Sequence, residues 1–197
     1  MFKAPIETDL YVYEHLFESP ANLEDIKVFE VDKPTGKGLE FYLKNMAKYE
    51  ERKRSNRTYL VRDKKTKEIA GYFSLRTGLF TLDSGREKES DDDITFYSVP
   101  SIELSNFAVN SAYRKQHPEV SKIGKDMFAN FILPVAQFTA QIVGVQAMHI
   151  YALPEDDLIG HYQSFGFHRL PEEMETFVHE HVKPMYDRNC IFMYLPL

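Results

Sequence analysis

The spacing of apolar residues predicts two helices in the first quarter of the chain. Ser19 and Pro20 are typical of a helix cap followed by a first-turn proline, so a short helix should run through about Phe29. A second helix is expected over residues 39–54, because apolar residues fall on one face there: Leu39, Leu43, Met46 and Ala47. Its last residues, the charge run 50–54 (EERKR), should form a solvated helix end, and the alternative is a contact with nucleic acid.

Strand-like segments follow this pair of helices. Residues 58–62 and 69–75 are rich in β-branched and aromatic side chains, and the polar turn 63–68 should join them as a hairpin. Residues 83–93 are acidic and are expected to form an exposed loop. Further strands are expected at 94–97 and 101–109, with Pro100 as a break or a bulge between them and a loop over 110–120.

The clearest helical stripe comes next. Apolar residues recur at steps of three or four, at Ile123, Met127, Phe131, Val135, Phe138 and Ile142. Pro134 lies inside this stripe and should kink the helix, and Gly144 should end it.

The last quarter of the chain alternates between strands and a helix. A strand is expected over 145–153. A helix capped by Asp156 or Asp157 should follow, and short strands are expected at 167–170 and 190–197. That helix carries Leu158, Tyr162 and Phe165 on one face.

The order of these elements predicts a mixed α/β fold. Two helices and a strand meander precede a strand–helix–strand–helix–strand series. The strand–helix–strand unit over 101–153 implies two parallel strands joined by a right-handed crossover. No repeat, low-complexity segment or linker interrupts the pattern, so we expect one domain over residues 1–197.

Composition narrows the class of protein. The chain has 197 residues, of which 43% are hydrophobic and 27% charged, as in globular proteins. The net charge of −6 argues against a generic nucleic-acid binder, although a local basic patch stays possible. The single cysteine, Cys190, cannot form an internal disulfide, and no run is long enough to span a membrane. The first residues lack the order of a signal peptide, so we expect a soluble cytoplasmic protein.

The start of the crossover helix, Lys122-Ile123-Gly124-Lys125, is a candidate anion site. A helix N-terminus offers unpaired N–H groups, and a glycine lets an anion approach them closely. Lys122, Lys125 and Arg114 add positive charge, which would suit a pyrophosphate. The alternative is that the glycine serves tight packing alone. The glycine patterns of nucleotide P-loops and of dinucleotide-binding folds are absent.

Four segments, in order, resemble the GNAT superfamily of acetyl-CoA-dependent N-acetyltransferases. Segment 69–75 (IAGYFSL) resembles the family's I-x-G-Y-x-x-L strand, and 102–109 (IELSNFAV) resembles the central strand with its "AV" step. Segment 122–127 (KIGKDM) resembles the second half of the family's Q/R-x-x-G-x-G/A loop. Segment 161–167 (HYQSFGF) is similar to the "FY-x-x-x-GF" signature, which is the most specific of the four.

The resemblance covers about residues 24–197 and implies a central mixed sheet whose two parallel strands splay apart, with helices on both faces. It implies acetyl-CoA as co-substrate and no metal. The pantetheine arm would bond to the central strand like an extra strand, and the pyrophosphate would sit on residues 120–125. The implied cofactor-binding residues are Phe107, Ala108, Val109, Arg114, Lys122, Ile123, Gly124 and Lys125.

Two positions depart from the family pattern. Lys122 stands where the family usually has its first glycine, and Glu119 stands where it has Gln or Arg. The loop after Val109 is also longer than usual. The grip on the pyrophosphate is therefore expected to be altered, with Arg114 or Lys122 compensating as a side-chain clamp.

The resemblance also implies an acid and a base. An alkyl ammonium, with a pKa near 10.4, must lose a proton before it attacks, and a partly buried carboxylate can take it. Glu103, six residues before Val109, stands where family members carry such a base; otherwise it is a solvent-facing or hairpin-paired glutamate. Tyr162 matches the family's general acid, or else is a core tyrosine. A strand N–H near Phe107 could stabilise the oxyanion.

Other reactive side chains fit a site less well. His179 and His181 stand two apart with no evident third metal ligand. His149 is expected to be a core histidine with satisfied hydrogen bonds. Cys190 and Ser105 lack the local patterns of nucleophiles. These side chains therefore predict no nucleophile site, and the two histidines predict no metal site.

Three functions stay open at this stage. The leading one is acetyl transfer from acetyl-CoA to a primary amine, on a small molecule or a peptide, by direct attack in a ternary complex. The second is the family's toxin-like branch, which acetylates aminoacyl-tRNA and needs a basic surface for RNA. The third is a non-catalytic acyl-CoA-binding or interaction module. The acidic balance of the chain favours a cationic acceptor, no membrane partner is expected, and the protein should be a monomer or a homodimer.

Overall fold

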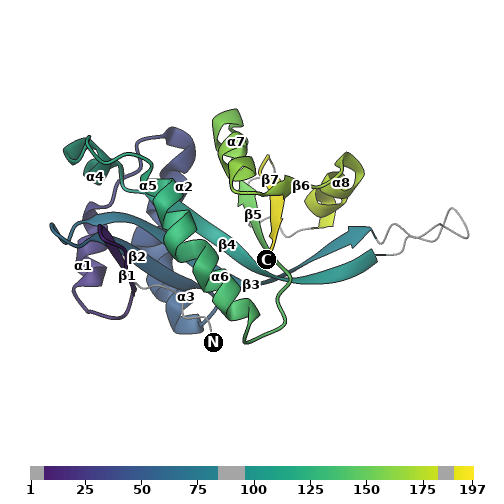
Figure 1. The fold of residues 1–197 in the computed structure, drawn as a ribbon, viewed down its shortest axis with the longest axis horizontal. Helices are drawn as coiled ribbons and strands as arrows, with labels where there is room; N and C mark the ends of the chain where they lie inside the picture. Colours follow the sequence, from purple (N-terminus) through teal and green to yellow (C-terminus); the bar gives the residue numbers. More distant parts are fainter. Residues whose placement is uncertain (1–6, 84–95, 182–188) are drawn as a thin grey trace, which may run out of the picture. The chain divides into compact units, whose positions relative to one another are not determined.

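The computed structural model describes residues 7–83, 96–181 and 189–197 (Figure 1). Its strands form one seven-stranded sheet in the order β1-β2-β3-β4-β5-β7-β6. They are β1 Tyr11–His15, β2 Arg57–Asp63, β3 Ile69–Asp83, β4 Phe96–Val109, β5 Ala147–Ala152, β6 His168–Arg169 and β7 Ile191–Pro196. The pair β4–β5 is parallel, whereas β1–β2, β2–β3, β5–β7 and β6–β7 are antiparallel. This mixed sheet confirms the predicted fold class.

The helical segments lie between the strands in the expected order, with two additions. Before β2 come α1 Asn22–Asp25, the 3₁₀ turns η1 Ile26–Val28 and η2 Pro34–Gly36, then α2 Lys37–Phe41, the π segment η3 Tyr42–Met46 and α3 Ala47–Lys53. Between β4 and β5 come α4 Ser111–Gln116, α5 Ile123–Met127, the π segment η4 Phe128–Ile132 and α6 Leu133–Ala140. After β5 come α7 Asp156–Ser164 and α8 Glu172–His181. The pattern of the sequence predicted neither α4 nor α8.

The chain divides into two compact units. Unit 1 comprises Met1–Arg76 and Leu104–Thr139, and unit 2 comprises Thr77–Glu103 and Ala140–Leu197. The long strands β3 and β4 each pass from one unit into the other.

In unit 1, helices cover both faces of the sheet. On one face α1, η1, η3 and α3 bury a cluster that comprises Leu16, Ile26, Phe29, Leu43, Ala47, Leu60, Ile69, Tyr72 and Ala108. On the other face α5 and η4 pack against the strands. Met127 of α5 lies beside Gly71, and the ring of Phe131 lies 5.2 Å from the ring of Tyr13. Figure 1 shows the green helix α5–α6 lying across these strands.

Both long helices of unit 1 contain a π segment, and this corrects the predicted buried faces. Each π turn holds one extra residue, so the buried stripe moves to a neighbouring position beyond it. Met46, at the end of η3, is 38% exposed although it was expected on a buried face. Ile142 is 63% exposed because it lies two residues beyond the end of α6, which was expected to continue to Gly144. Ile132 and Ala136 are buried instead, and Val135 is only half-buried.

Two further expectations were wrong. Pro100 does not break the strand, because β4 runs through it and the Pro100 carbonyl accepts a hydrogen bond from the Gln146 N–H at 2.9 Å. In the charge run 50–54, Glu51 is buried rather than solvated. Its carboxylate accepts hydrogen bonds from the Thr58 N–H and from Arg57 at 2.8 Å, so it ties α3 to β2. The predicted loop over 83–93 lies almost entirely outside the described residues.

Unit 2 has its own core on one face of its strands. Phe80, Val99, Ala147 and Phe192 pack there against Leu170 and against Met174 and Val178 of α8. Because α8 covers this face, polar side chains beneath it are shielded from water. None of the helices in the described ranges is long and apolar enough to cross a bilayer.

Candidate active site

One edge of β4 is unpaired in the stretch that the sequence assigned to the cofactor. The parallel register between β4 and β5 covers Ser101 to Glu103 and ends at the pair Glu103–His149. From Leu104 to Val109 this edge of β4 therefore pairs with no described strand. The opposite edge of β4 faces β3, and just beyond the strand the Asn110 N–H donates to the Ala70 carbonyl of β3 at 2.9 Å. Unpaired N–H and C=O groups of this kind can bind an extended ligand as an additional strand.

The start of α5 lies against the same stretch of β4. A Cβ atom placed on Gly124 would be 3.5 Å from the Val109 side chain and 3.7 Å from the Phe107 ring, so the helix packs closely on these two residues. Asp126 has the first N–H of the helix that finds a backbone acceptor, the Lys122 carbonyl at 3.0 Å. Among the described residues, the N–H groups of Ile123, Gly124 and Lys125 have no acceptor. Three donors thus remain available at the positive end of the helix.

Lys122 caps this helix in the left-handed conformation, with φ +60° and ψ +25°. That region favours glycine and costs other L-residues about 1–2 kcal/mol. The position where the resemblance implies a glycine therefore keeps the backbone shape of a glycine, while it presents a lysine side chain.

Exposed cations stand on α4 and at the start of α5. Arg114, Lys122 and Lys125 are all exposed, and none contacts a carboxylate in the described part of the chain. Glu119 pairs with His117 at 3.4 Å instead. Glu68 and Glu119 raise the pKa of His117, so that this imidazole adds further positive charge when protonated.

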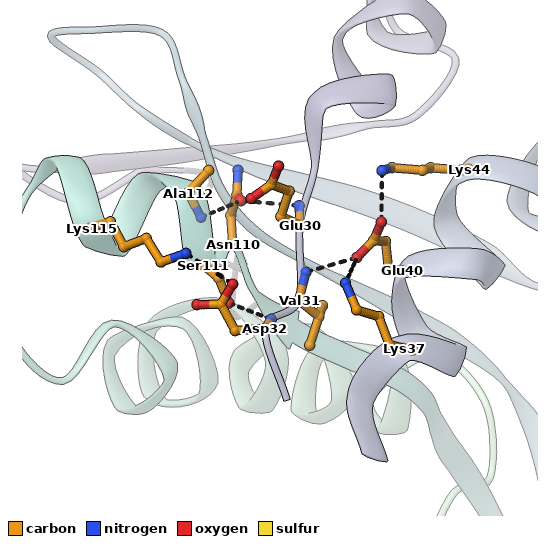
Figure 2. Close-up of polar contacts among 10 residues, drawn as sticks. All are labelled: Glu30, Val31, Asp32, Lys37, Glu40, Lys44, Asn110, Ser111, Ala112 and Lys115. Atoms are coloured by element: carbon orange, nitrogen blue, oxygen red, sulfur yellow. Dashed lines mark hydrogen bonds and ion pairs between the residues drawn. The ribbon is translucent and has the colours of Figure 1, made fainter. Parts of the chain in front are cut away.

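Figure 2 shows a network of hydrogen bonds, the polar clamp, that holds the loop over residues 30–32 beside the end of β4. Asn110 caps α4 through the Ala112 N–H, and the same oxygen accepts the Glu30 N–H at 3.2 Å. Ser111 donates its N–H to the Glu30 carbonyl and accepts the Asp32 N–H at 3.0 Å. The loop is thus held by the two residues that directly follow Val109.

Glu40 binds the middle residue of this loop, Val31. Its carboxylate accepts hydrogen bonds from the Val31 N–H, from Lys44 at 2.8 Å and from Lys37 at 2.9 Å. Lys44 and Lys37 lower the pKa of Glu40 to about 2, so the carboxylate stays ionised in all but strongly acidic solution.

In unit 2 the predicted base is a buried side chain. Glu103 is 5% exposed and is the last β4 residue paired with β5. Its carboxylate lies 3.5 Å from Nε2 of His149, its partner in the register. His149 in turn contacts the Ser101 hydroxyl through Nδ1 at 2.9 Å.

Tyr162, the predicted acid, lies on α7 and is 7% exposed. Its ring meets the Phe167 ring edge-on at 5.6 Å. Its hydroxyl has no hydrogen bond to any described residue, and burial raises the pKa of the phenol. The ring is buried, and the hydroxyl can form a hydrogen bond with solvent or with a ligand.

The structure thus gathers the predicted cofactor residues in unit 1, whereas Glu103 and Tyr162 belong to unit 2. Neither the polar clamp around residues 30–32 nor the contacts of His149 were predicted from the sequence. Asn110 and Ser111 after an apolar strand are a helix-cap signal, which would have predicted α4. The pairing of Glu103 with His149 depends on a strand register that no local pattern reveals.

Comparison with known proteins identifies the fold. No protein-family model and no curated protein sequence matches the chain. A mutant of KacT matches with a TM-score of 0.64 and 19% identity over 95% of each chain. AtaTR bound with AcCoA matches with a TM-score of 0.61 and 18% identity, over 96% of this chain and 94% of that one. AtaT complexed with acetyl-methionyl-tRNAfMet matches with 0.59 and 18%, over 92% and 93%. The chain therefore has the fold of KacT and AtaT, which agrees with the fold expected from the sequence.

Proposed function

We propose that the protein transfers the acetyl group of acetyl-CoA to a primary amine. The observation that carries this proposal is the start of α5, where three backbone N–H groups have no acceptor among the described residues. This helix start packs on the stretch of β4 whose edge is unpaired. Related solved structures support it, because AtaTR has been solved with AcCoA bound.

The residues of unit 1 fit the chemistry of the co-substrate. The three free N–H groups at the start of α5, with Arg114, Lys122 and Lys125 nearby in the sequence, suit a pyrophosphate. The unpaired edge over 104–109 suits the amide-bearing pantetheine arm, which can bond as a strand does. When bound, acetyl-CoA supplies the acetyl group as a thioester.

In this proposal Glu103 is the general base. Its carboxylate accepts a proton from the acceptor ammonium, whose lone pair then becomes free to attack the carbonyl carbon. Glu103 directly precedes the unpaired stretch of β4, so it lies at the strand position where that stretch begins.

Tyr162 acts as the general acid in the same proposal. As the bond between carbon and sulfur breaks, the phenol donates its proton to the leaving thiolate. The second proton that the acceptor nitrogen loses on forming the amide restores the phenol, and the proton on Glu103 passes to water. The transfer therefore releases one proton overall.

A second candidate acceptor is aminoacyl-tRNA. AtaT has been solved with acetyl-methionyl-tRNAfMet, and in this chain α3 presents cations beside an exposed aromatic ring. Tyr49 is 52% exposed, with the Lys53 ammonium 4.4 Å from the centre of its ring, and Arg52 is also exposed. Cations and stacking rings are the groups that bind single-stranded RNA ends.

Two measurements test the proposed function. Acetyl-CoA should raise the melting temperature, and a panel of amines that includes aminoacyl-tRNA, read by mass spectrometry, should identify the product that gains an acetyl group. Glu103→Gln is the matched control, because it should bind acetyl-CoA and fail to transfer. Binding without transfer to any amine would favour the non-catalytic acyl-CoA module. Absence of binding would overturn the proposal.

The acceptor is tested separately. Arg52→Glu combined with Lys53→Glu should weaken transfer to aminoacyl-tRNA and leave transfer to small amines unchanged. The same loss with both acceptors would show that α3 does not select RNA.

A further inference from the structure

Three polar side chains form a buried row on one face of β4 and β5 in unit 2. Ser101 and Glu103 stand two residues apart on β4, so both point to the same face of the sheet. His149 is the register partner of Glu103. Nδ1 of His149 lies 2.9 Å from the Ser101 hydroxyl, and Nε2 lies 3.5 Å from the Glu103 carboxylate. All three residues are at most 5% exposed.

Aromatic rings fix the His149 imidazole in place. It stacks on Phe192 with centroids 5.4 Å apart and an angle of 25° between the planes. Phe80 and Tyr151 meet it edge-on at 5.6 and 5.9 Å. A ring enclosed in this way has little freedom to rotate away from its two polar partners.

Gly78 on β3 completes the enclosure. A Cβ atom at this position would overlap Cε1 of His149 and would lie 3.1 Å from the Ser101 hydroxyl. The backbone therefore approaches the imidazole so closely that only glycine fits without displacing the ring.

The partners determine which ring nitrogen of His149 carries the hydrogen. An ionised carboxylate only accepts hydrogen bonds, so a lone pair on Nε2 facing Glu103 would be repelled. The favoured arrangement has the hydrogen on Nε2, and Nδ1 then accepts the hydroxyl proton of Ser101. At 3.5 Å the Nε2–H group acts on Glu103 mainly through electrostatic attraction.

We propose that His149 is a positioning residue for the base Glu103, and that Ser101 holds its imidazole with Nε2–H toward the carboxylate. This inference rests on the proposed function, in which Glu103 removes the proton of the acceptor ammonium. A buried carboxylate keeps a fixed orientation when a positioned donor faces it. His149 supplies that donor, while the proton of the substrate moves to Glu103 and not to the imidazole.

The kinetic test separates positioning from packing. His149→Phe keeps an aromatic ring in the enclosure and removes both nitrogens. It should lower kcat about tenfold, less than the 10²–10⁴-fold that general bases contribute, with KM for acetyl-CoA nearly unchanged. His149→Gln places an amide N–H near the position of Nε2 and should restore most of kcat. Equal losses of kcat in the two folded variants would overturn the proposal.

A double mutant adds a sharper criterion. In the Glu103→Gln background, His149→Phe should lower the rate no further, because the imidazole acts through the carboxylate. The same additional loss as in the wild-type background would overturn the proposal. Melting temperatures measured on every variant separate loss of folding from loss of rate, and His149→Gln serves as the test variant if His149→Phe does not fold.

Nitrogen NMR tests the proposal without an activity measurement. Nitrogen NMR of the His149 ring should show the hydrogen on Nε2, an Nε2 resonance that moves in Glu103→Gln, and a mixture of both forms in Ser101→Ala. A hydrogen on Nδ1 in the wild-type protein would overturn the arrangement. If the wild-type protein transfers no acetyl group, the proposed function fails and this spectrum alone decides whether His149 holds Glu103.

Discussion

In unit 1 the candidate cofactor residues present backbone N–H groups and exposed cations, whereas in unit 2 the candidate acid and base are buried side chains. In the proposed function several donors share the anion at the start of α5, so each contributes a fraction of the binding energy. Glu103 and Tyr162 each transfer one proton in that proposal, so the loss of either side chain removes a whole step. Substitutions in unit 2 should therefore act on the rate, and substitutions in unit 1 on affinity and by smaller factors.

The largest effect is expected for Glu103→Gln. This change keeps the size of the side chain but removes its ability to accept a proton, so the rate at neutral pH should fall by roughly 10²–10⁴. The loss should shrink as the pH approaches the pKa of the amine, about 10.4, because more of the acceptor is then neutral. Affinity for acetyl-CoA, measured by calorimetry, should stay constant. A wild-type rate at neutral pH would remove Glu103 from the mechanism.

Tyr162→Phe should have the next largest effect. Because the hydroxyl has no bond to a described residue, its loss should change the melting temperature little. Turnover should fall by about 10², with acetyl-CoA affinity nearly intact. Burial raises the pKa of this phenol, so the acid form should persist over the whole accessible pH range. A lower melting temperature with unchanged turnover per folded molecule would instead indicate a core tyrosine.

Gly124→Val tests the contrast from the side of unit 1. A branched side chain would press on Val109 and Phe107 and keep an anion away from the free N–H groups. The dissociation constant of acetyl-CoA should rise about tenfold, or about 1.4 kcal/mol, while the fold survives. Gly124→Ala is the matched control, since a single Cβ fits at ordinary contact distances. Unchanged calorimetric affinity in folded Gly124→Val would refute this placement of the pyrophosphate.

The smallest effect is expected for Lys122→Gly. Glycine adopts φ +60° without strain, so stability to urea should rise by up to about 1 kcal/mol, offset in part by the greater freedom of the unfolded chain. Affinity for acetyl-CoA should fall only about threefold, because exposed charges interact weakly through water. Lys122→Met removes the charge and keeps the backbone strain. If Lys122→Met binds as the wild type does, the lysine plays no part in holding the anion.

Local patterns predicted the class of the fold and strand segments within β2 to β7, because alternation and turn residues act over a few positions, but they missed β1 at Tyr11–His15. They misplaced Met46 and Val135 because the regular period of 3.6 residues is interrupted by the π segments at 42–46 and 128–132, and they misplaced Ile142 because α6 ends at Ala140, before Gly144. Each interruption depends on packing along the whole helix. A periodic reading therefore fails beyond it, even where the helix itself is correctly predicted.

Long-range contacts explain the remaining differences. Glu51 belongs to a charge run, yet it is buried because Thr58 and Arg57 supply hydrogen-bond donors from the next strand. His149 was expected to be a core histidine with satisfied hydrogen bonds, and the structure does give it a buried partner in Ser101. Its proximity to Glu103 arises from a parallel register between segments 46 positions apart in the sequence, which no short motif encodes. The roles of Glu103 and Tyr162 stay predictions.

The unpaired edge of β4 has a consequence for how the protein behaves in storage. A strand with free N–H and C=O groups is a template for any extended chain, so segment 104–109 is a place where purified molecules can begin to aggregate. A ligand that bonds along this edge would block that route. Coenzyme A added to the buffer should then lengthen the shelf life of concentrated samples, an effect that light scattering over several days would detect.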